Sequence, residues 1–368
     1  MFQRELNSEE RTVMALRDLY SAYGYRQYKV SKFESYDLYA SNRNFLQSKQ
    51  ILTFTDTNGR LMALKPDVTL SIIKNTEPDA AISKVYYTEN VYRVPKNGDG
   101  FQEIMQTGLE LIGAVDDYAM AEVVMLAERS LRAISDDYVL DLSHIGVLSG
   151  LLDSCDLDED QRAALMQAVG QKNLHRIREL CGRYQLPASF CSSLEALVRL
   201  YGPLDAALDE AEAMDLPAES LACVRALQRL SRLLKSFGCR NLRLDFSLIN
   251  DMDYYNGLVF RGFISGVAAG VLSGGRYDNL MAKMGRNQSA IGFAVYLDQL
   301  ERFDARSRAY DVDAALYYRD DSDLSVLIAE AQALTAKGCS VRVLPEGAGT
   351  VRARQTWIME GTEVHPIG

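Results

Sequence analysis

The chain has 368 residues, of which 48% are hydrophobic and 24% are charged, as in folded proteins with a large core. Fifty acidic residues against forty basic ones give a net charge of −10. This charge argues against broad nucleic-acid binding, which rests on clustered Lys and Arg that neutralise phosphates. The length allows two or three domains, and the composition excludes a disordered chain.

The cysteines and histidines indicate no metal centre. The six cysteines have no C-x-x-C spacing and the three histidines are widely scattered. We therefore expect reduced thiols, no metal and no cofactor. The first residues, MFQRELNSEER, lack the apolar stretch of a signal peptide, so the expected location is cytoplasmic, without membrane contact.

The first part of the chain predicts a sheet flanked by helices. Residues 8–23 carry apolar side chains at helical spacing, and Gly24 ends the run. Asn58-Gly59 lies between two alternating runs and predicts a β-hairpin. Further strands are predicted near 84–95, 101–114 and 138–146, with a helix over 117–135. This order is typical of an α+β fold built on an antiparallel sheet.

The predicted secondary structure changes twice along the rest of the chain. Amphipathic segments over 147–238 predict a helical insertion, with Ser192 and Glu195 spaced as a capping box. Residues 311–368 predict a small β-α-β-α-β domain with a second, short helix. The expected parts are a sheet domain over 1–146 and 239–303, the insertion over 147–238, and the C-terminal domain over 311–368.

Three stretches place polar groups where a small zwitterion could bind. Such a pocket needs acceptors for an ammonium, donors for a carboxylate and groups specific to the side chain. The candidates lie in LKPDVT, QTGLE and the pair DYYNG and GGRYD, and they are Asp67, Thr69, Gln106, Glu110, Tyr254, Tyr255, Arg276 and Tyr277.

Each stretch taken alone also has a simpler interpretation. Asp67 could cap a helix that begins at Val68. Gln106 and Glu110 share one face of a strand, and a solvated face is the usual explanation. Adjacent tyrosines in a strand point to opposite faces, so only one of them can line a pocket. Gly274-Gly275 could form a turn or a bulge.

The order of the motifs favours one family. The stretches LKPDVT, YR before a loop, QTGLELIG, DYYNGLVF, GGRYDNLM and IGFAVYLDQL follow one another over residues 5–303. In this order they resemble the catalytic domain of histidyl-tRNA synthetases. The resemblance implies a class II aminoacyl-tRNA synthetase-like fold, in which helices flank an antiparallel sheet.

The resemblance also implies a histidine site. It assigns the histidine ammonium to Asp67, Thr69 and Gln106, one imidazole nitrogen to Glu110, and the other to Tyr255. Arg93 is the expected partner of the histidine carboxylate. The complete expected set is Asp67, Thr69, Arg93, Gln106, Glu110, Tyr254, Tyr255 and Tyr277.

The groups that would handle ATP depart from the family pattern. Where the synthetases carry arginines, this sequence has Asn250 and Gln299, and Asp251 adds a negative charge beside the first of them. Pro95 stands in place of the glutamate that reads adenine, and Gln102 replaces a basic residue. Because losing one donor to a developing charge costs about 3–4 kcal/mol, we expect no adenylation and no catalytic residues.

A histidine site without adenylation chemistry resembles the regulatory subunits of ATP phosphoribosyltransferase, a family of histidyl-synthetase paralogues. The shortened C-terminal part, with nine acidic and five basic residues over 311–368, offers little surface to a tRNA. The resemblance implies a short-form catalytic partner subunit, L-histidine as effector, and a homodimer within a hetero-oligomer. Ser31 replaces the proline that helps to set the family's dimer interface.

Two other functions stay open at this point. One is a working histidyl-tRNA synthetase with a shortened tail. The other is a stand-alone histidine-binding sensor or scaffold.

Overall fold

The computed structural model describes residues 8–43, 46, 50–77, 81–94, 100–249, 255–300 and 310–367. The chain forms two compact units. The larger comprises residues 12–300, and the smaller comprises 301–368 together with 1–11. Each unit has its own sheet, so each is considered by itself below.

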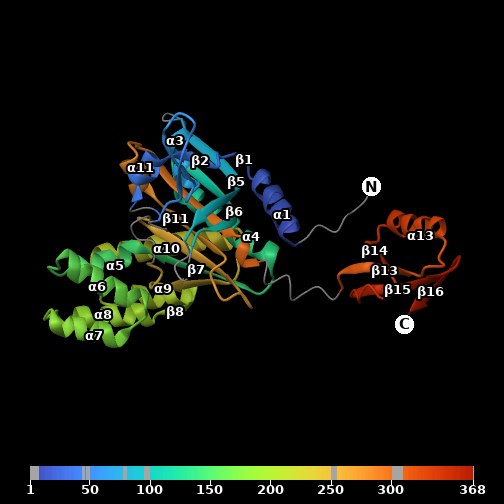
Figure 1. The fold of residues 1–368 in the computed structure, drawn as a ribbon. Coiled ribbons are helices and arrows are strands. Elements are labelled where there is room, and N and C mark those ends of the chain that lie inside the picture. The colour runs from blue at the N-terminus through green and yellow to red at the C-terminus, as the bar shows by residue number, and fades with distance from the viewer. Residues whose placement is uncertain are drawn as a thin grey trace. The chain divides into compact units, whose positions relative to one another are not determined.

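A nine-stranded sheet runs through the larger unit (Figure 1). Its pairs are antiparallel except for β1 with β5 and β7 with β9. In spatial order the strands are β1 (Arg26–Gln27), β5 (Ile82–Arg93), β6 (Gln102–Gly113), β12 (Ser289–Tyr296), β11 (Leu272–Arg276), β10 (Leu258–Ile264), β7 (Tyr138–His144), β9 (Leu242–Asp245) and β8 (Tyr201–Pro203). The predicted antiparallel centre is confirmed.

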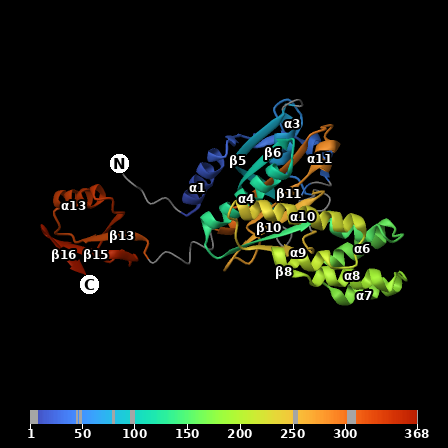
Figure 2. The same cartoon turned by 180° about the vertical axis from the view of Figure 1, so that it is seen from behind.

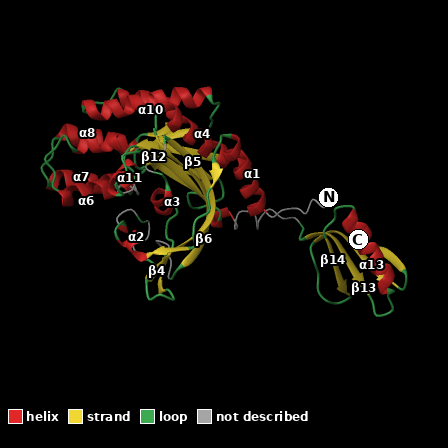
Figure 3. Ribbon diagram, turned by 90° about the horizontal axis from the view of Figure 1, so that it is seen from above, coloured by secondary structure: helices red, strands yellow, loops and turns green. Residues whose placement is uncertain are grey.

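Three long helices cover one face of this sheet, namely α1 (Ser8–Ala22), α4 (Asp117–Ile134) and α10 (Ala218–Ser236). Tyr20 of α1 packs its ring against Tyr86 and Phe293. Asp116 caps the start of α4, since its side chain accepts a hydrogen bond from the amide of Ala119. Figures 2 and 3 show α4 and α10 side by side along the sheet. This layer leaves the opposite face of the sheet for the polar residues.

Smaller elements pack on that opposite face. They are a sheet of β2 (Phe33–Ser35), β4 (Leu61–Leu64) and β3 (Thr53–Thr55), with α2 (Tyr36–Ala40), α3 (Thr69–Asn75) and α11 (Asp278–Lys283). The hairpin between β3 and β4 turns at Gly59, whose φ of 78° suits glycine, as Asn58-Gly59 predicted. Buried residues of these elements form one apolar cluster with Tyr87, Ile112 and Tyr277.

The helical segment consists of α5 (Ile145–Leu152), α6 (Glu159–Gly170), α7 (Leu174–Arg183), α8 (Ala188–Arg199), α9 (Leu204–Glu212) and α10. It also supplies β8, which pairs with β9 at the sheet edge. The predicted capping box at Ser192 is wrong because α8 begins earlier, after Pro187, and Glu195 instead pairs with Arg178 and Arg199. A capping box forms at α6, between Asp158 and Gln161.

Residues 310–367 of the smaller unit form a four-stranded sheet with one helix. The order is β14 (Val341–Pro345), β13 (Val312–Tyr318), β15 (Ala353–Glu360) and β16 (Glu363–Ile367), and α13 (Leu324–Ala336) packs on one face (Figure 3). The short second helix that we predicted is absent from these residues. Its place is taken by β15, because alternate side chains such as Trp357 and Met359 pack against α13.

Among the helices of the described residues, none has both the length and the apolar content needed to cross a membrane. No group of three or more His, Cys, Asp or Glu side chains lies close enough to hold a metal ion in the described part of the chain.

Candidate functional site

The carboxyl group of Glu110 is the centre of the polar face. The Thr69 hydroxyl donates a hydrogen bond of 2.7 Å to Oε1, and the Tyr277 hydroxyl donates one of 2.6 Å to Oε2. Thr69 comes from the first turn of α3, Glu110 from β6, and Tyr277 from the residue before α11. Three predicted motifs therefore meet at one carboxyl group.

Glu110 is not the solvated residue that its alternation along β6 alone would suggest. Its side chain is only 2% exposed, and Tyr277 is buried beside it. Burial raises the pKa of Glu110 to about 8, with Asp67 adding to the rise and the hydroxyls of Tyr277 and Thr69 opposing it. The raised pKa favours the protonated form of the carboxyl group.

Asp67 lies at the N-terminus of α3 and does what a capping residue does. Its Oδ1 accepts a hydrogen bond of 2.9 Å from the amide of Leu70, as a capping side chain does, although α3 begins at Thr69, one residue later than the simpler interpretation placed it. Burial raises the pKa of Asp67, and the positive charge of Arg93 opposes that rise. Asp67 can lie at the candidate site and also accept a hydrogen bond from α3, because α3 begins at the site.

Arg93 ends β5 and is buried against the same segment. Its Nε donates to the carbonyl oxygen of Pro66 at 2.5 Å. The guanidinium group therefore holds the LKPD stretch in place and lies near Asp67. Directly across the strand pair lies Gln102.

Gln106 is also buried on this face, with 2% of its surface exposed. Its Oε1 has no hydrogen-bond partner among the described residues. Buried polar atoms are nearly always paired, so an acceptor of this kind points to a donor on a ligand or a water molecule. In the sheet it lies opposite Glu89 of β5 and Tyr296 of β12.

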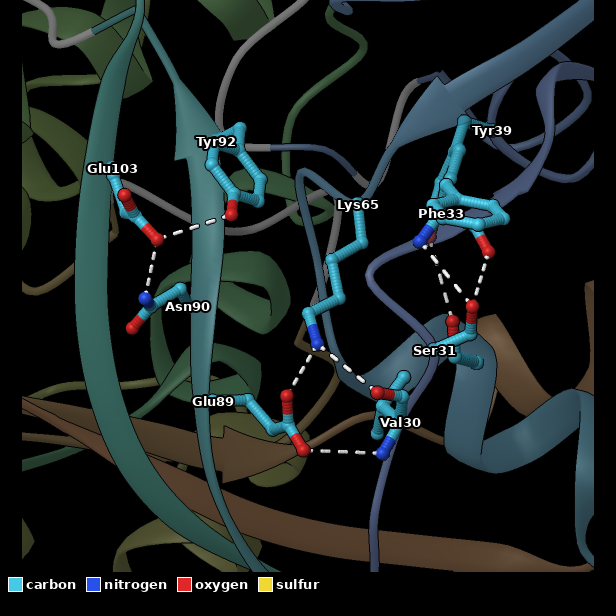
Figure 4. Close-up of polar contacts among 10 residues, drawn as sticks. Val30, Ser31, Phe33, Tyr39, Lys65, Glu89, Asn90, Tyr92 and Glu103 are labelled. Atoms are coloured by element: carbon cyan, nitrogen blue, oxygen red, sulfur yellow. Dashed lines mark hydrogen bonds and ion pairs between the residues drawn. The ribbon is translucent and has the colours of Figure 1, made fainter. Parts of the chain in front are cut away.

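A buried ion pair beside Gln106 was not predicted from the sequence. Lys65, only 1% exposed, donates from Nζ to Oε2 of Glu89 at 2.5 Å and to the Val30 carbonyl oxygen at 3.4 Å. The Val30 amide in turn donates to Oε1 of Glu89 at 3.2 Å (Figure 4). A lysine inside the apolar run LMALKPD is the signal that could have indicated this pair, because a buried cation needs an anion.

The neighbouring side chains of β5 point away from the site. Asn90 and Tyr92 both donate to Glu103 on the other side of the strand, as Figure 4 shows. Because alternate residues of a strand face opposite sides, β5 presents Glu89 and Arg93 to the site.

Tyr255 lies beside the site, but not in a strand as predicted, since β10 begins only at Leu258. Its ring packs over Gly275 of β11, where the two glycines that we allowed for a turn or bulge form regular strand pairs. Tyr254, Asn250, Asp251 and Pro95 lie outside the described residues.

Two other candidate positions are occupied by local interactions. The Arg276 guanidinium pairs with Asp278 at 2.7 Å and also donates to Ser289, so it serves the start of α11. The Gln299 amide donates to Asp298 at 2.8 Å.

A large antiparallel sheet with helices on one face and buried carboxyl, amide and hydroxyl groups on the other is the architecture of class II aminoacyl-tRNA synthetase catalytic domains. Residues 1–300 match the profile of the family Histidyl-tRNA synthetase. The ATP phosphoribosyltransferase regulatory subunit of Symbiobacterium thermophilum is 30% identical over 89% of this chain and 84% of its own length. The chain therefore belongs to the histidyl-tRNA synthetase family, in the branch of the ATP phosphoribosyltransferase regulatory subunits.

Solved structures agree on the fold. An ATP phosphoribosyltransferase regulatory subunit/histidyl-tRNA synthetase from Bacillus halodurans superposes with a TM-score of 0.73 at 24% identity, covering 93% of this chain and 90% of that chain. A chain of the ATP phosphoribosyl transferase (HisG:HisZ) complex from Thermotoga maritima gives 0.62 at 20% identity, covering 80% of this chain and 98% of its own. The predicted class II synthetase-like fold is confirmed.

Proposed function

We propose that this chain is a non-catalytic regulatory subunit of ATP phosphoribosyltransferase, required for the first step of histidine biosynthesis, and that L-histidine binds at Glu110. The observation that carries the proposal is the buried Glu110 carboxyl group, oriented by Thr69 and Tyr277 from two other segments. Such a group suits an imidazole ring. An apolar side chain would offer the carboxyl group no hydrogen bond beyond those that it accepts from Thr69 and Tyr277.

The surrounding residues supply the other contacts that histidine needs. The unpartnered Oε1 of Gln106 is a buried acceptor for the ligand ammonium, and the Asp67 carboxyl group at the start of α3 is a further oxygen acceptor of the proposed site. Arg93 is the proposed partner of the ligand carboxylate. Tyr254 and Tyr255 complete the proposed site, with the Tyr255 hydroxyl at the second imidazole nitrogen.

The proposed subunit does not adenylate histidine with ATP. Gln299 stands where related synthetases carry an arginine, and its amide is engaged by Asp298. Gln102 is likewise uncharged and lies across from Arg93. Losing one donor to a developing charge typically lowers a rate by 10²–10³-fold. The substitutions at Asn250 and Asp251, read from the sequence, also lower the expected rate of adenylation.

The proposed partner is a short-form catalytic ATP phosphoribosyltransferase subunit, bound by a homodimer of this chain within a hetero-oligomer. The names of the relatives support this assignment, as does the Thermotoga maritima complex of similar fold. Feedback by histidine requires that the ligand binds one state of the complex more tightly than another. The site then acts as a sensor whose output is the activity of the other chain.

Two measurements separate this proposal from its rivals. A stable complex with the short-form catalytic subunit, seen by size-exclusion chromatography, supports it, whereas no complex at micromolar concentration favours a stand-alone histidine sensor. Histidine-dependent exchange of pyrophosphate into ATP would instead identify a working synthetase. We expect no exchange above background.

A further inference from the structure

Two glycines lie on neighbouring strands directly beneath the candidate site. Gly292 of β12 is the register partner of Glu110 on one side and of Gly275 in β11 on the other. Neither glycine has a positive φ, so the backbone conformation does not require glycine there. Glycine inside a strand costs about 0.5–1 kcal/mol relative to alanine, so a different reason must favour it.

At Gly292 the reason is the carboxyl group of Glu110. A Cβ atom on Gly292 would lie 1.8 Å from Oε2 of Glu110, 2.7 Å from its Cδ and 2.5 Å from the Leu109 carbonyl oxygen. No side chain fits at these distances. The Glu110 side chain therefore lies flat across β12, where its Oε2 meets the Tyr277 hydroxyl.

At Gly275 the reasons are the ring of Tyr255 and the backbone of Leu258. A Cβ atom there would lie 2.7 Å from Cδ1 of the ring, 3.0 Å from Cγ, and 2.7 Å from the carbonyl oxygen of Leu258. The tyrosine ring thus lies directly on β11. The two proposed imidazole contacts rest on adjacent strands, whose spacing is about 4.8 Å.

We propose that Gly275 and Gly292 are specificity-determining residues, which keep the Glu110 carboxyl group and the Tyr255 ring low on the sheet so that a flat nitrogen-containing ring can lie against both. This inference rests on the proposed histidine site. A side chain at either position lifts its neighbour into the space that the ligand ring would use. The glycines therefore act by positioning other residues, without touching the ligand themselves.

The same sheet offers a matched control. Gly202 in β8 is also a strand glycine, but a Cβ atom there would have no neighbour within 4 Å. Gly202→Ala therefore adds the same methyl group to the same sheet without displacing a side chain. Any loss that Gly292→Ala or Gly275→Ala shows beyond this control comes from the local contacts of the new methyl group, which are Glu110 or Tyr255 and one backbone carbonyl oxygen at each position.

The test is calorimetric titration of the full chain with L-histidine. We expect Gly292→Ala and Gly275→Ala each to weaken binding at least tenfold, and Gly202→Ala to leave it within twofold of wild type. Binding within twofold of wild type in Gly292→Ala would overturn the inference. No binding by the wild-type chain would instead overturn the proposed histidine site on which this inference rests.

A second measurement covers the case in which Gly292→Ala folds poorly. Thermal unfolding is compared for wild type, Gly292→Ala, Glu110→Ala and the double variant. Because the new methyl group mainly meets the Glu110 carboxyl group, we expect the loss of Tm to shrink by at least half in the Glu110→Ala background. An equal loss in both backgrounds would assign the clash to the Leu109 carbonyl oxygen and contradict the positioning role.

Discussion

The Tyr277 hydroxyl donates a 2.6 Å hydrogen bond to Oε2 of Glu110, a residue 167 positions earlier in the chain. The other oxygen of the same carboxyl group accepts from Thr69, which lies 41 positions from Glu110. Since these contacts join β6 to two separate helix starts, the site exists only when the sheet and the smaller elements on its face are assembled. Binding at this site and folding of the larger unit are therefore closely linked.

Removing the central carboxyl group tests the site most simply. Glu110→Ala should weaken L-histidine binding at least tenfold, because the ligand ring loses a buried, ionisable hydrogen-bond partner. Calorimetry on the purified chain measures this directly. Glu103→Ala is the matched control, since Glu103 lies on the same strand but is exposed on the opposite side. Equal affinities for both variants would contradict the assignment of Glu110.

The Tyr277 hydroxyl should affect histidine binding indirectly, by holding the Glu110 carboxyl group in position. Tyr277→Phe keeps the ring that packs in the apolar cluster and removes one hydrogen bond of the carboxyl group. We expect a fivefold to twentyfold weaker affinity for histidine, equivalent to about 1–2 kcal/mol. Tyr92→Phe removes a hydroxyl that faces away from the site and should change affinity less than twofold. The reverse ranking of the two variants would refute this role.

The raised pKa of Glu110 predicts a dependence of stability on pH. The folded chain holds this proton up to about pH 8, whereas an unperturbed glutamate loses it near 4.5. Between these values the folded state binds more protons, so the free energy of unfolding falls as pH rises from about 4.5 to about 8. Glu110→Gln cannot lose a proton and should flatten this decline. Urea unfolding at pH 5 and pH 8 tests it, and an unchanged decline in the variant would disprove it.

The buried pair of Lys65 and Glu89 should be important for stability. Lys65→Met leaves the Glu89 carboxylate without its cation and should lower the free energy of unfolding by about 3 kcal/mol or more. Lys74 also pairs with a glutamate, Glu34, but its side chain is 46% exposed. Lys74→Met should therefore cost less than about 1 kcal/mol. Urea denaturation compares the two, and similar costs would argue against a distinct role for Lys65.

Much of the fold could be predicted because its local signals agree with its tertiary contacts. The helix before Gly24, the hairpin at Asn58-Gly59 and the long strands of the sheet all follow from spacing and turn chemistry. The failures occur where packing outweighs local pattern. Glu195 fits a capping box in sequence, yet Pro187 sets the start of α8 earlier and Glu195 pairs with arginines.

The sequence indicates candidate site residues, but it does not indicate their environment. Period-two alternation places Gln106 and Glu110 on one face of β6, but it does not reveal whether that face is solvated or covered. The covering elements α3 and α11 come from distant parts of the sequence. For the same reason, the Lys65 and Glu89 pair depends on the packing of the smaller sheet beside β5, which no local pattern specifies.

The most direct test of the regulatory role is the rate of phosphoribosyl transfer to ATP by the short-form catalytic subunit, measured with and without this chain. We expect activity to rise at least tenfold when the chain is added, and to fall again with L-histidine in the wild-type complex but much less in a Glu110→Ala complex. A catalytic subunit with the same rate in the presence and absence of this chain would contradict the proposed function.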